Sequence, residues 1–120
     1  VKFLGQRSDA NELYQAMDLF LFPSLYEGLG MVLIEAQCAG LPCVASTEVP
    51  EIAKISDKVI FEDLKENLKI WAGICLKFLN GKSIRKSSEK SLDIQNYNIK
   101  NEAKKLRYKY SSLLRIGDYK

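Results

Sequence analysis

The sequence predicts an α/β domain in which a parallel sheet is flanked by helices. Short apolar runs that suit buried strands alternate with longer segments of helical pattern over residues 1–81, and proline or glycine follows several of these segments. Because strands alternate with helices, we expect consecutive strands to run parallel, with the connecting helices on both faces of the sheet. The chain of 120 residues, 47% of them hydrophobic, is sufficient for one ordinary domain.

The first two strands are predicted on either side of a helix. Val1–Leu4 is an apolar segment that indicates a short strand. Asp9 and Glu12 have the capping-box spacing, which predicts a helix through about residue 17. Leu19–Phe22 is a continuous apolar run, and this pattern favours a parallel strand that is buried on both faces.

A second helix and a third strand are predicted in the middle of the chain. Gly30–Ala39 is apolar on nearly every side, so we expect a buried helix, and Gly40 supplies a C-terminal stop. Pro42–Ser46 indicates another short strand. Pro50 suits the first turn of a short helix over Glu51–Ala53.

A fourth strand and a longer helix complete the predicted α/β part. Lys58–Phe61 has the pattern of a strand. Asp63 and Glu66 repeat the capping-box spacing, and the helix that they open is expected to run to about Leu79 and to end at Gly81. The chain is thereby predicted to consist of a partial ligand-binding domain over residues 1–81 and C-terminal helices over residues 82–120.

The C-terminal part is predicted to hold two helices. A polar helix is expected from Ser83 to about Ile94. The last helix carries an apolar stripe at spacings of four and three residues, and this stripe should pack against something. Its members are Ile99, Ala103, Leu106, Tyr110 and Leu113.

Charge is distributed unevenly between these two parts. Residues 1–81 carry 7 basic and 11 acidic side chains, whereas residues 82–120 carry 11 basic and 4 acidic ones. The basic tail has three interpretations: the solvated face of surface helices, attraction to an anionic membrane surface or lipid phosphate, and, with least support, nucleic acid. Because the tail contains no groove-reading or base-stacking module, we do not expect nucleic acid as a partner.

Composition excludes several kinds of chemistry. The chain has no histidine, which removes Ser-His and Cys-His nucleophile systems. Cys38, Cys43 and Cys75 stand singly without metal-ligand spacing, so we expect no metal site and interpret them as reduced core residues of a cytoplasmic protein. No apolar run approaches the roughly 18 to 20 residues of a membrane span, and residues 1–5 lack a signal-peptide pattern, so we expect the chain to begin inside a fold.

Two carboxylates flank a glycine turn at the expected ligand-binding edge of the sheet. Glu27 precedes Gly28 and Gly30, and Glu35 follows seven residues beyond Gly28. The glycines permit a sharp turn and close approach of the backbone to a ligand, and the helix that begins near Gly30 offers free N–H groups suited to phosphate. The carboxylates suit the hydroxyl groups of a sugar or ribose.

The alternative is that both acids are solvated surface charges and the glycines only mark a turn. Two considerations favour a site. Glu35 lies in an otherwise apolar helix, where a carboxylate without a partner is costly, and both acids fall near the carboxyl ends of the strands.

These residues also carry a family resemblance. Over roughly residues 1–62 the chain resembles the retaining glycosyltransferases of family 4, with a looser similarity in the helices beyond. The matching segments are Phe3-Leu4-Gly5, Asp18 to Ser24, Tyr26-Glu27-Gly28, Val32 to Ala36 and Gly40 to Ser46.

The resemblance implies an incomplete C-terminal domain of a GT-B glycosyltransferase, in which two Rossmann-like domains face a cleft. It implies that Glu27 is the catalytic-site carboxylate that contacts the donor sugar. Gly28 lies in the substrate-binding turn, and the amides of Gly30 and Met31 face the distal phosphate and the sugar. Glu35 holds the ribose.

In such enzymes a nucleotide-diphosphate sugar is the donor, and a UDP-sugar is expected here. Transfer retains the anomeric configuration, usually without a metal or other cofactor. The segment Thr47–Glu51 is similar to versions in bacterial surface-polysaccharide transferases. A saccharide or lipid-linked acceptor and a cytoplasmic location, with peripheral contact at the inner face of the membrane, are therefore expected.

The resemblance further implies two strands upstream of Val1, together with a basic pair that holds the diphosphate, and an acceptor domain. We therefore expect this chain to hold half a site and to be inactive alone. Two alternatives stay open at this stage: a nucleotide-sugar epimerase of the same fold, and a nonenzymatic α/β interaction module.

Overall fold

The structure is a computed structural model of the 120-residue chain, and it describes residues 1–81 and 97–117. The chain forms two compact units, Val1–Ser88 and Glu89–Lys120, which are considered separately. The polar helix expected between residues 83 and 94 lies outside the described residues.

The first unit is built on a parallel sheet of three strands. In spatial order the strands are β1 (Phe20–Phe22), β2 (Cys43–Ser46) and β3 (Val59–Glu62). The registers pair Phe20 with Cys43 and Cys43 with Val59. All three strands lie where the apolar runs predict them, so the predicted α/β class with a parallel sheet is confirmed.

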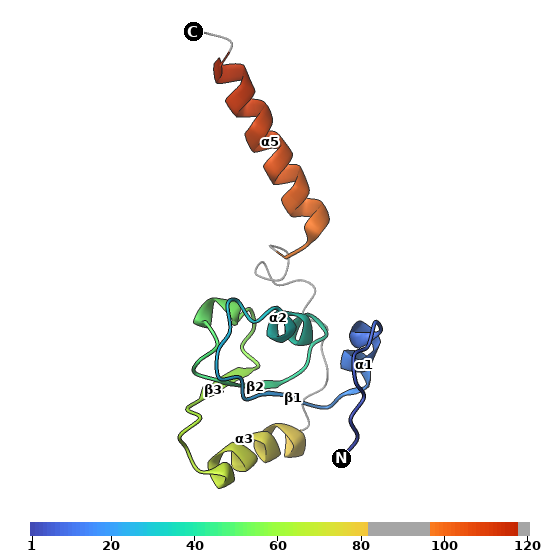
Figure 1. The fold of residues 1–120 in the computed structure, drawn as a ribbon, viewed down its shortest axis with the longest axis vertical. Coiled ribbons are helices and arrows are strands. Elements are labelled where there is room, and N and C mark those ends of the chain that lie inside the picture. Colours follow the sequence, from blue (N-terminus) through green and yellow to red (C-terminus); the bar gives the residue numbers. More distant parts are fainter. Residues whose placement is uncertain (82–96, 118–120) are drawn as a thin grey trace. The chain divides into compact units, whose positions relative to one another are not determined.

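Helices cover both faces of this sheet. Helix α2 (Met31–Cys38) and helix α3 (Leu68–Asn80) lie on opposite faces, and α1 (Ala10–Ala16) lies beside the β1 edge (Figure 1). A short 3-10 helix, η1 (Glu51–Ala53), follows β2 at the position that Pro50 predicts. The arrangement is the three-layer solution that buries both faces of a parallel sheet.

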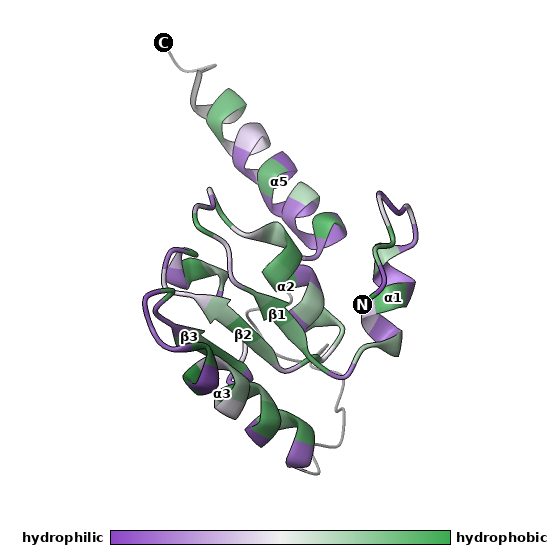
Figure 2. Ribbon diagram, turned by 60° about the horizontal axis from the view of Figure 1, so that its bottom comes forward, coloured by the Kyte–Doolittle hydropathy of each residue, from purple (hydrophilic) through white to green (hydrophobic). Residues whose placement is uncertain are grey.

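The core is centred on β2, the middle strand. All four of its residues are fully buried, and apolar colour predominates along the strands of the sheet (Figure 2). Trp71 fixes α3 beneath the sheet: its side chain is buried, and its indole N–H donates to the carbonyl oxygen of Asp63 at 3.0 Å. A buried Trp needs such a partner for its single N–H group.

The predicted strand at Val1–Leu4 is wrong. These residues form no strand in the structure, and the side chains of Val1 and Phe3 are almost fully exposed. A strand is stable only beside a neighbour that pairs its backbone groups, and the described residues supply none to this segment.

Both predicted capping boxes are wrong in detail. Asp9 precedes α1, but its carboxylate forms no cap and instead accepts from the guanidinium of Arg7, at 2.7 Å from Nε. The cationic guanidinium offers a donor to each carboxylate oxygen, so it competes effectively with a backbone N–H for this carboxylate. Helix α3 begins at Leu68, later than expected, because the side chain of Asn67 accepts from the amide of Lys69 at 2.9 Å.

The burial expected for several segments is also corrected. Leu21 in β1 is 49% exposed, because β1 is an edge strand of the described sheet and α3 packs mainly beneath β2. Helix α2 buries only its inner face and exposes Met31, Val32 and Glu35. Among the three free cysteines only Cys43 is buried, whereas the other two are half-buried.

The described part of the second unit is helix α5 (Ile99–Gly117), which appears where the apolar stripe predicts a final helix. The apolar residues of that stripe are exposed in the structure rather than packed. Over residues 1–81 and 97–117, no helix combines the length and the apolar character that crossing a membrane requires.

Candidate functional site

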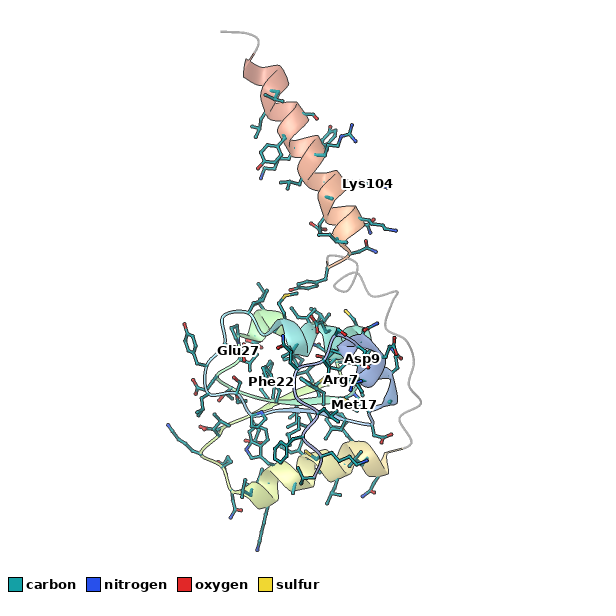
Figure 3. All side chains as sticks on the ribbon, turned by 45° about the vertical axis from the view of Figure 1, so that its right-hand side comes forward. Arg7, Asp9, Met17, Phe22, Glu27 and Lys104 are labelled. Carbon is teal, nitrogen blue, oxygen red and sulfur yellow. The ribbon has the colours of Figure 1, made fainter. Side chains whose placement is uncertain are left out.

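The candidate site lies in two loops at the carboxyl edge of the sheet. Residues 23–30 connect β1 to α2, and residues 47–50 connect β2 to η1. Because the strands are parallel, both loops leave the sheet at the same edge, where ligands bind in folds of this class. Figure 3 shows Glu27 in the first loop and Phe22 at the end of β1.

Two serines connect the loops to each other and to Glu27. The buried Ser46 ends β2, and its hydroxyl donates to the carbonyl oxygen of Ser24. The hydroxyl of Ser24 lies 2.9 Å from Oε1 of Glu27 and 3.2 Å from the carbonyl oxygen of Tyr26. The Ser24 hydroxyl thereby orients the half-buried Glu27 carboxylate, and Ser46 of β2 holds Ser24 in place. The remaining lone pairs of the Glu27 carboxylate are available to other donors.

Gly30 is required at the point where the first loop enters α2. Its φ of +75° lies in the left-handed region, which residues with a Cβ rarely adopt. A Cβ at this position would also lie 2.9 Å from Cγ1 of Val49 in the second loop. Gly28 differs, because nothing lies within 4 Å of its Cβ position, so that glycine leaves an open surface before the helix.

The first turn of α2 presents unpaired backbone amides. The amides of Leu33 and Ile34 donate to the carbonyl oxygen of Gly30, at 2.9 and 3.4 Å. Within the described residues, the amides of Met31 and Val32 donate to no backbone carbonyl, as is usual at a helix N-terminus. These N–H groups and the positive end of the helix dipole can bind phosphate oxygens.

Glu35 lies one turn into α2 and accepts from α1. The hydroxyl of Tyr14 donates to Oε2 of Glu35 at 3.3 Å, and the ring of Tyr14 packs edge-on against Phe20 at 5.7 Å. Burial of Tyr14, and secondarily the Glu35 carboxylate, raise the pKa of the phenol. The phenol therefore keeps its proton at neutral pH and acts as the donor in this pair.

The apolar sequence of α2 predicts a buried Glu35, but this prediction is wrong, since the Glu35 side chain is exposed on the outer face of α2. Met31 and Glu35 are four residues apart, so they lie on the same face of the helix, separated by about 6 Å along its axis. The exposed face of α2 therefore begins with free amides and continues to a carboxylate, an arrangement suited to a phosphate followed by a hydroxylated group.

Gln37 holds the end of η1 and the segment after it against the opposite face of α2. Its fully buried side-chain amide donates to the carbonyl oxygens of Leu33 at 3.0 Å and Ala53 at 2.7 Å. Its carbonyl oxygen accepts from the amide of Ile55 at 2.8 Å and the hydroxyl of Ser56 at 3.2 Å. All four hydrogen-bonding positions of the amide are used, so η1, into which the second loop leads, is tied to the helix that Gly30 begins.

The second loop surrounds a hollow of about 320 Å³ at this edge. Glu48 and Glu51 contribute carboxylates to its lining, and Val49 connects it to Gly30. Over the described residues, the structure contains no group of three or more acidic or cysteine side chains able to hold a metal ion.

Sequence reasoning located the acids and the glycines but gave no role to four side chains that organise them: Tyr14, Ser24, Gln37 and Ser46. A signal existed for the two serines, since Ser24 follows β1 closely and Ser46 ends β2, and polar residues at strand ends line the binding edge of such sheets. The structure places Glu27, Gly28, Gly30 and Met31 consecutively around the entry to α2, with Glu35 one turn beyond. The ligand roles of these five residues stay predictions.

The parallel sheet with flanking helices defines an α/β domain, and its glycine loop leads into a helix N-terminus of the kind that can bind phosphate esters. Residues 1–69 match the family described as glycosyl transferases group 1. This match spans more than half of the chain, and the chain therefore belongs to that family of glycosyltransferases.

Individual relatives agree with this assignment. EpsF of Bacillus subtilis (strain 168), named as a glycosyltransferase, is 41% identical over 73 residues, which are 60% of this chain and 19% of that protein. An Escherichia coli UDP-Gal:alpha-D-GlcNAc-diphosphoundecaprenol alpha-1,3-galactosyltransferase is 46% identical over 43 residues, 36% of this chain and 11% of that enzyme.

The lipopolysaccharide core biosynthesis mannosyltransferase LpsB of Rhizobium meliloti (strain 1021) is 27% identical over 122 residues, 96% of this chain and 34% of that enzyme. The chain thus spans about a third or less of these relatives.

Proposed function

We propose that this chain provides the nucleotide-sugar half of a retaining GT-B glycosyltransferase, as the C-terminal part of its donor-binding domain. The enzyme would transfer a hexosyl-type sugar from a nucleotide-diphosphate sugar to a saccharide or lipid-linked acceptor. The observation that carries the proposal is the exposed face of α2, which begins with unpaired amides next to Gly30 and carries Glu35 one turn further on.

The chemistry of each group supports a distinct role. A diphosphate accepts hydrogen bonds from the amides at the start of α2 and is stabilised by the helix dipole. Glu35 accepts from the ribose diol, while Tyr14 donates to the same carboxylate and fixes its direction. Glu27 accepts from hydroxyl groups of the donor sugar, held toward them by Ser24.

A UDP-sugar is the donor that we propose, and the acceptor is one used in bacterial surface-polysaccharide synthesis. The support is the chemistry named for two relatives: one uses UDP-Gal with a diphosphoundecaprenol-linked acceptor, and another builds the lipopolysaccharide core. Such reactions would place the parent protein in the cytoplasm at the inner face of the membrane. The remaining diphosphate contacts and the acceptor site are assigned to other parts of the parent, and no metal or cofactor is assigned to this half-site.

Donor binding is tested by titrating the full chain with UDP and following its amide NMR signals. We expect saturable shifts in residues 28–35 at millimolar UDP. Glu35→Ala should lower the affinity for UDP at least about tenfold, since a lost hydrogen bond to a charged group costs about 1.5–3 kcal/mol. Glu66→Ala removes an exposed carboxylate outside the two loops and should leave the affinity unchanged.

A second ligand separates the ribose contact from general weakening. UDP with a 2′,3′-dideoxyribose lacks the diol that Glu35 is proposed to hold. It should bind the wild-type chain as weakly as UDP binds Glu35→Ala, and the variant should not distinguish the two ligands. Absence of any shift at millimolar UDP, or equal discrimination by wild type and variant, would contradict the assignment.

A further inference from the structure

Helix α5 carries an exposed apolar stripe that nothing in the donor site uses. Leu106, Tyr110 and Leu113 are 53%, 60% and 55% exposed, and Ile99 at the start of the helix is 79% exposed. A contiguous apolar strip of this kind on a described helix indicates an interaction surface rather than an ordinary solvent face. Figure 2 shows apolar and polar positions alternating along α5.

The stripe is narrow and straight. At 100° per residue, Ile99, Ala103, Leu106, Tyr110 and Leu113 fall within an arc of about 80° on the helix surface. Leu114, which is 74% exposed, widens the arc to about 100°. The five-residue stripe runs from the first residue of α5 over most of its 19 residues.

Cationic side chains border the stripe on both sides. Lys100 and Arg107 lie about 80–100° to one side of its centre line, whereas Lys105 and Lys109 lie at about −80° to −120° on the other. Over residues 99–114 there are five basic side chains and one acidic one, a net charge of +4. The single acid, Glu102, is paired with Lys105 at 2.7 Å and offsets one of the two positive charges on that side, which keeps a net charge of +1 there.

We propose that α5 lies in the surface of an anionic lipid bilayer, with the stripe in the acyl boundary and the two cationic borders among the head groups. A bilayer places hydrocarbon under the stripe and negative charge on both sides of it at once, which matches both borders. Long Lys and Arg side chains reach outward from such a position, so their charges stay in water.

This docking does not rest on the donor site, because it uses only residues of α5. The role that the docking gives the basic tail does rest on the proposed function: α5 holds a donor-binding unit against the surface where lipid-phosphate groups are exposed. The energy comes from two sources. Burial of the stripe in hydrocarbon and the attraction of each basic residue to the anionic surface both favour binding.

Cosedimentation of the full chain with vesicles tests the proposal. We expect binding to phosphatidylcholine vesicles that contain 30% phosphatidylglycerol. Pure phosphatidylcholine should bind at least about tenfold more weakly, and 0.5 M NaCl should weaken the binding to the anionic vesicles.

Two tyrosines two residues apart provide a matched pair of variants. Tyr110 lies within the stripe, whereas Tyr108, 77% exposed, lies on the opposite side of the helix. Tyr110→Glu should lower vesicle binding by at least about tenfold, because it places a charge in the acyl boundary. Tyr108→Glu changes the net charge equally and should lower binding by less than about threefold.

Circular dichroism of both variants shows whether the helix persists, and sedimentation velocity without lipid shows whether the stripe is used between copies. Equal loss in the two variants with helicity retained would overturn the proposal. So would failure of the wild-type chain to bind anionic vesicles, or a dimer that Tyr110→Glu alone dissociates.

Discussion

The side chain of Val49 occupies the space that a Cβ on Gly30 would need, with Cγ1 2.9 Å from that position. This contact joins the loop after β1 to the loop after β2, and it lies at the residue from which α2 begins. The glycine and the valine therefore set the position of the helix N-terminus relative to the rest of the carboxyl edge.

Gly30→Ala should destabilise the first unit by about 2–4 kcal/mol. The left-handed φ of +75° costs an alanine about 1–2 kcal/mol, and the contact with Val49 forces a further adjustment of about 1–2 kcal/mol. Urea unfolding monitored by Trp71 fluorescence measures the loss. Gly28→Ala is the control, and its effect should stay within about 0.5 kcal/mol because its Cβ position is open.

The same pair offers a stricter test. If the contact with Val49 is responsible for part of the loss, Gly30→Ala combined with Val49→Ala should be less destabilising than the sum of the two single variants. Strict additivity would assign the whole effect to the backbone conformation instead.

Gln37→Met should destabilise the first unit by about 3 kcal/mol or more while preserving the volume of the side chain. The substitution removes partners from the amide of Ile55 and the carbonyl oxygen of Ala53, and buried groups left unpaired cost about 1–3 kcal/mol each. Thermal unfolding compared with Gln6→Met, at an exposed position, measures this cost. A loss below about 1 kcal/mol would show that water replaces the amide.

Ser46→Ala should weaken binding of a UDP-sugar through Glu27 and destabilise the unit by about 1 kcal/mol. Its hydroxyl holds Ser24, and Ser24 in turn donates to the Glu27 carboxylate. NMR titration should show altered shifts at residues 24–28 together with weaker affinity for a UDP-sugar. Ser111→Ala, on the exposed surface of α5, should change neither quantity. Unchanged affinity in Ser46→Ala would remove Ser46 from the chain of orienting contacts.

The pH dependence of stability should report the burial of Cys43. Burial raises the pKa of this thiol to about 12 from its ordinary value of 9.0. The unfolded chain then releases the proton at a lower pH than the folded chain does. The free energy of unfolding should therefore fall between about pH 9 and about 12, by up to about 1.4 kcal/mol per pH unit for this group.

Cys43→Ala isolates that contribution, because other groups also titrate over the same range. Urea unfolding under reducing conditions at pH 8 and pH 10.5 should give a smaller decrease in the variant than in the wild type. Identical decreases would mean that Cys43 is open to solvent in the native state.

Much of the fold was predictable from local pattern. The apolar runs around Phe20, Val44 and Ile60 indicated the three strands, because a parallel strand that is covered on both faces consists mainly of apolar residues. The strand predicted at Val1–Leu4 failed for a related reason, since apolar character alone does not supply a pairing neighbour. Asp9 failed as a cap because Arg7, a nearby cation, competes for its carboxylate.

For the site, the sequence determined which groups stand at the carboxyl edge: the carboxylates of Glu27 and Glu35, and the glycine on which α2 begins. Spacing along the chain fixes these positions, because each lies within a few residues of a strand end or a helix start.

Only the tertiary structure decided how those groups are held. Ser46 is 22 residues from Ser24 and Tyr14 is 21 residues from Glu35, and these contacts form when the sheet brings separate loops and helices together. The same packing put Glu35 on the exposed face of its helix. Hydrogen bonds between residues that are far apart in the sequence form only when the intervening chain folds back and brings them together, and the local sequence pattern does not specify this.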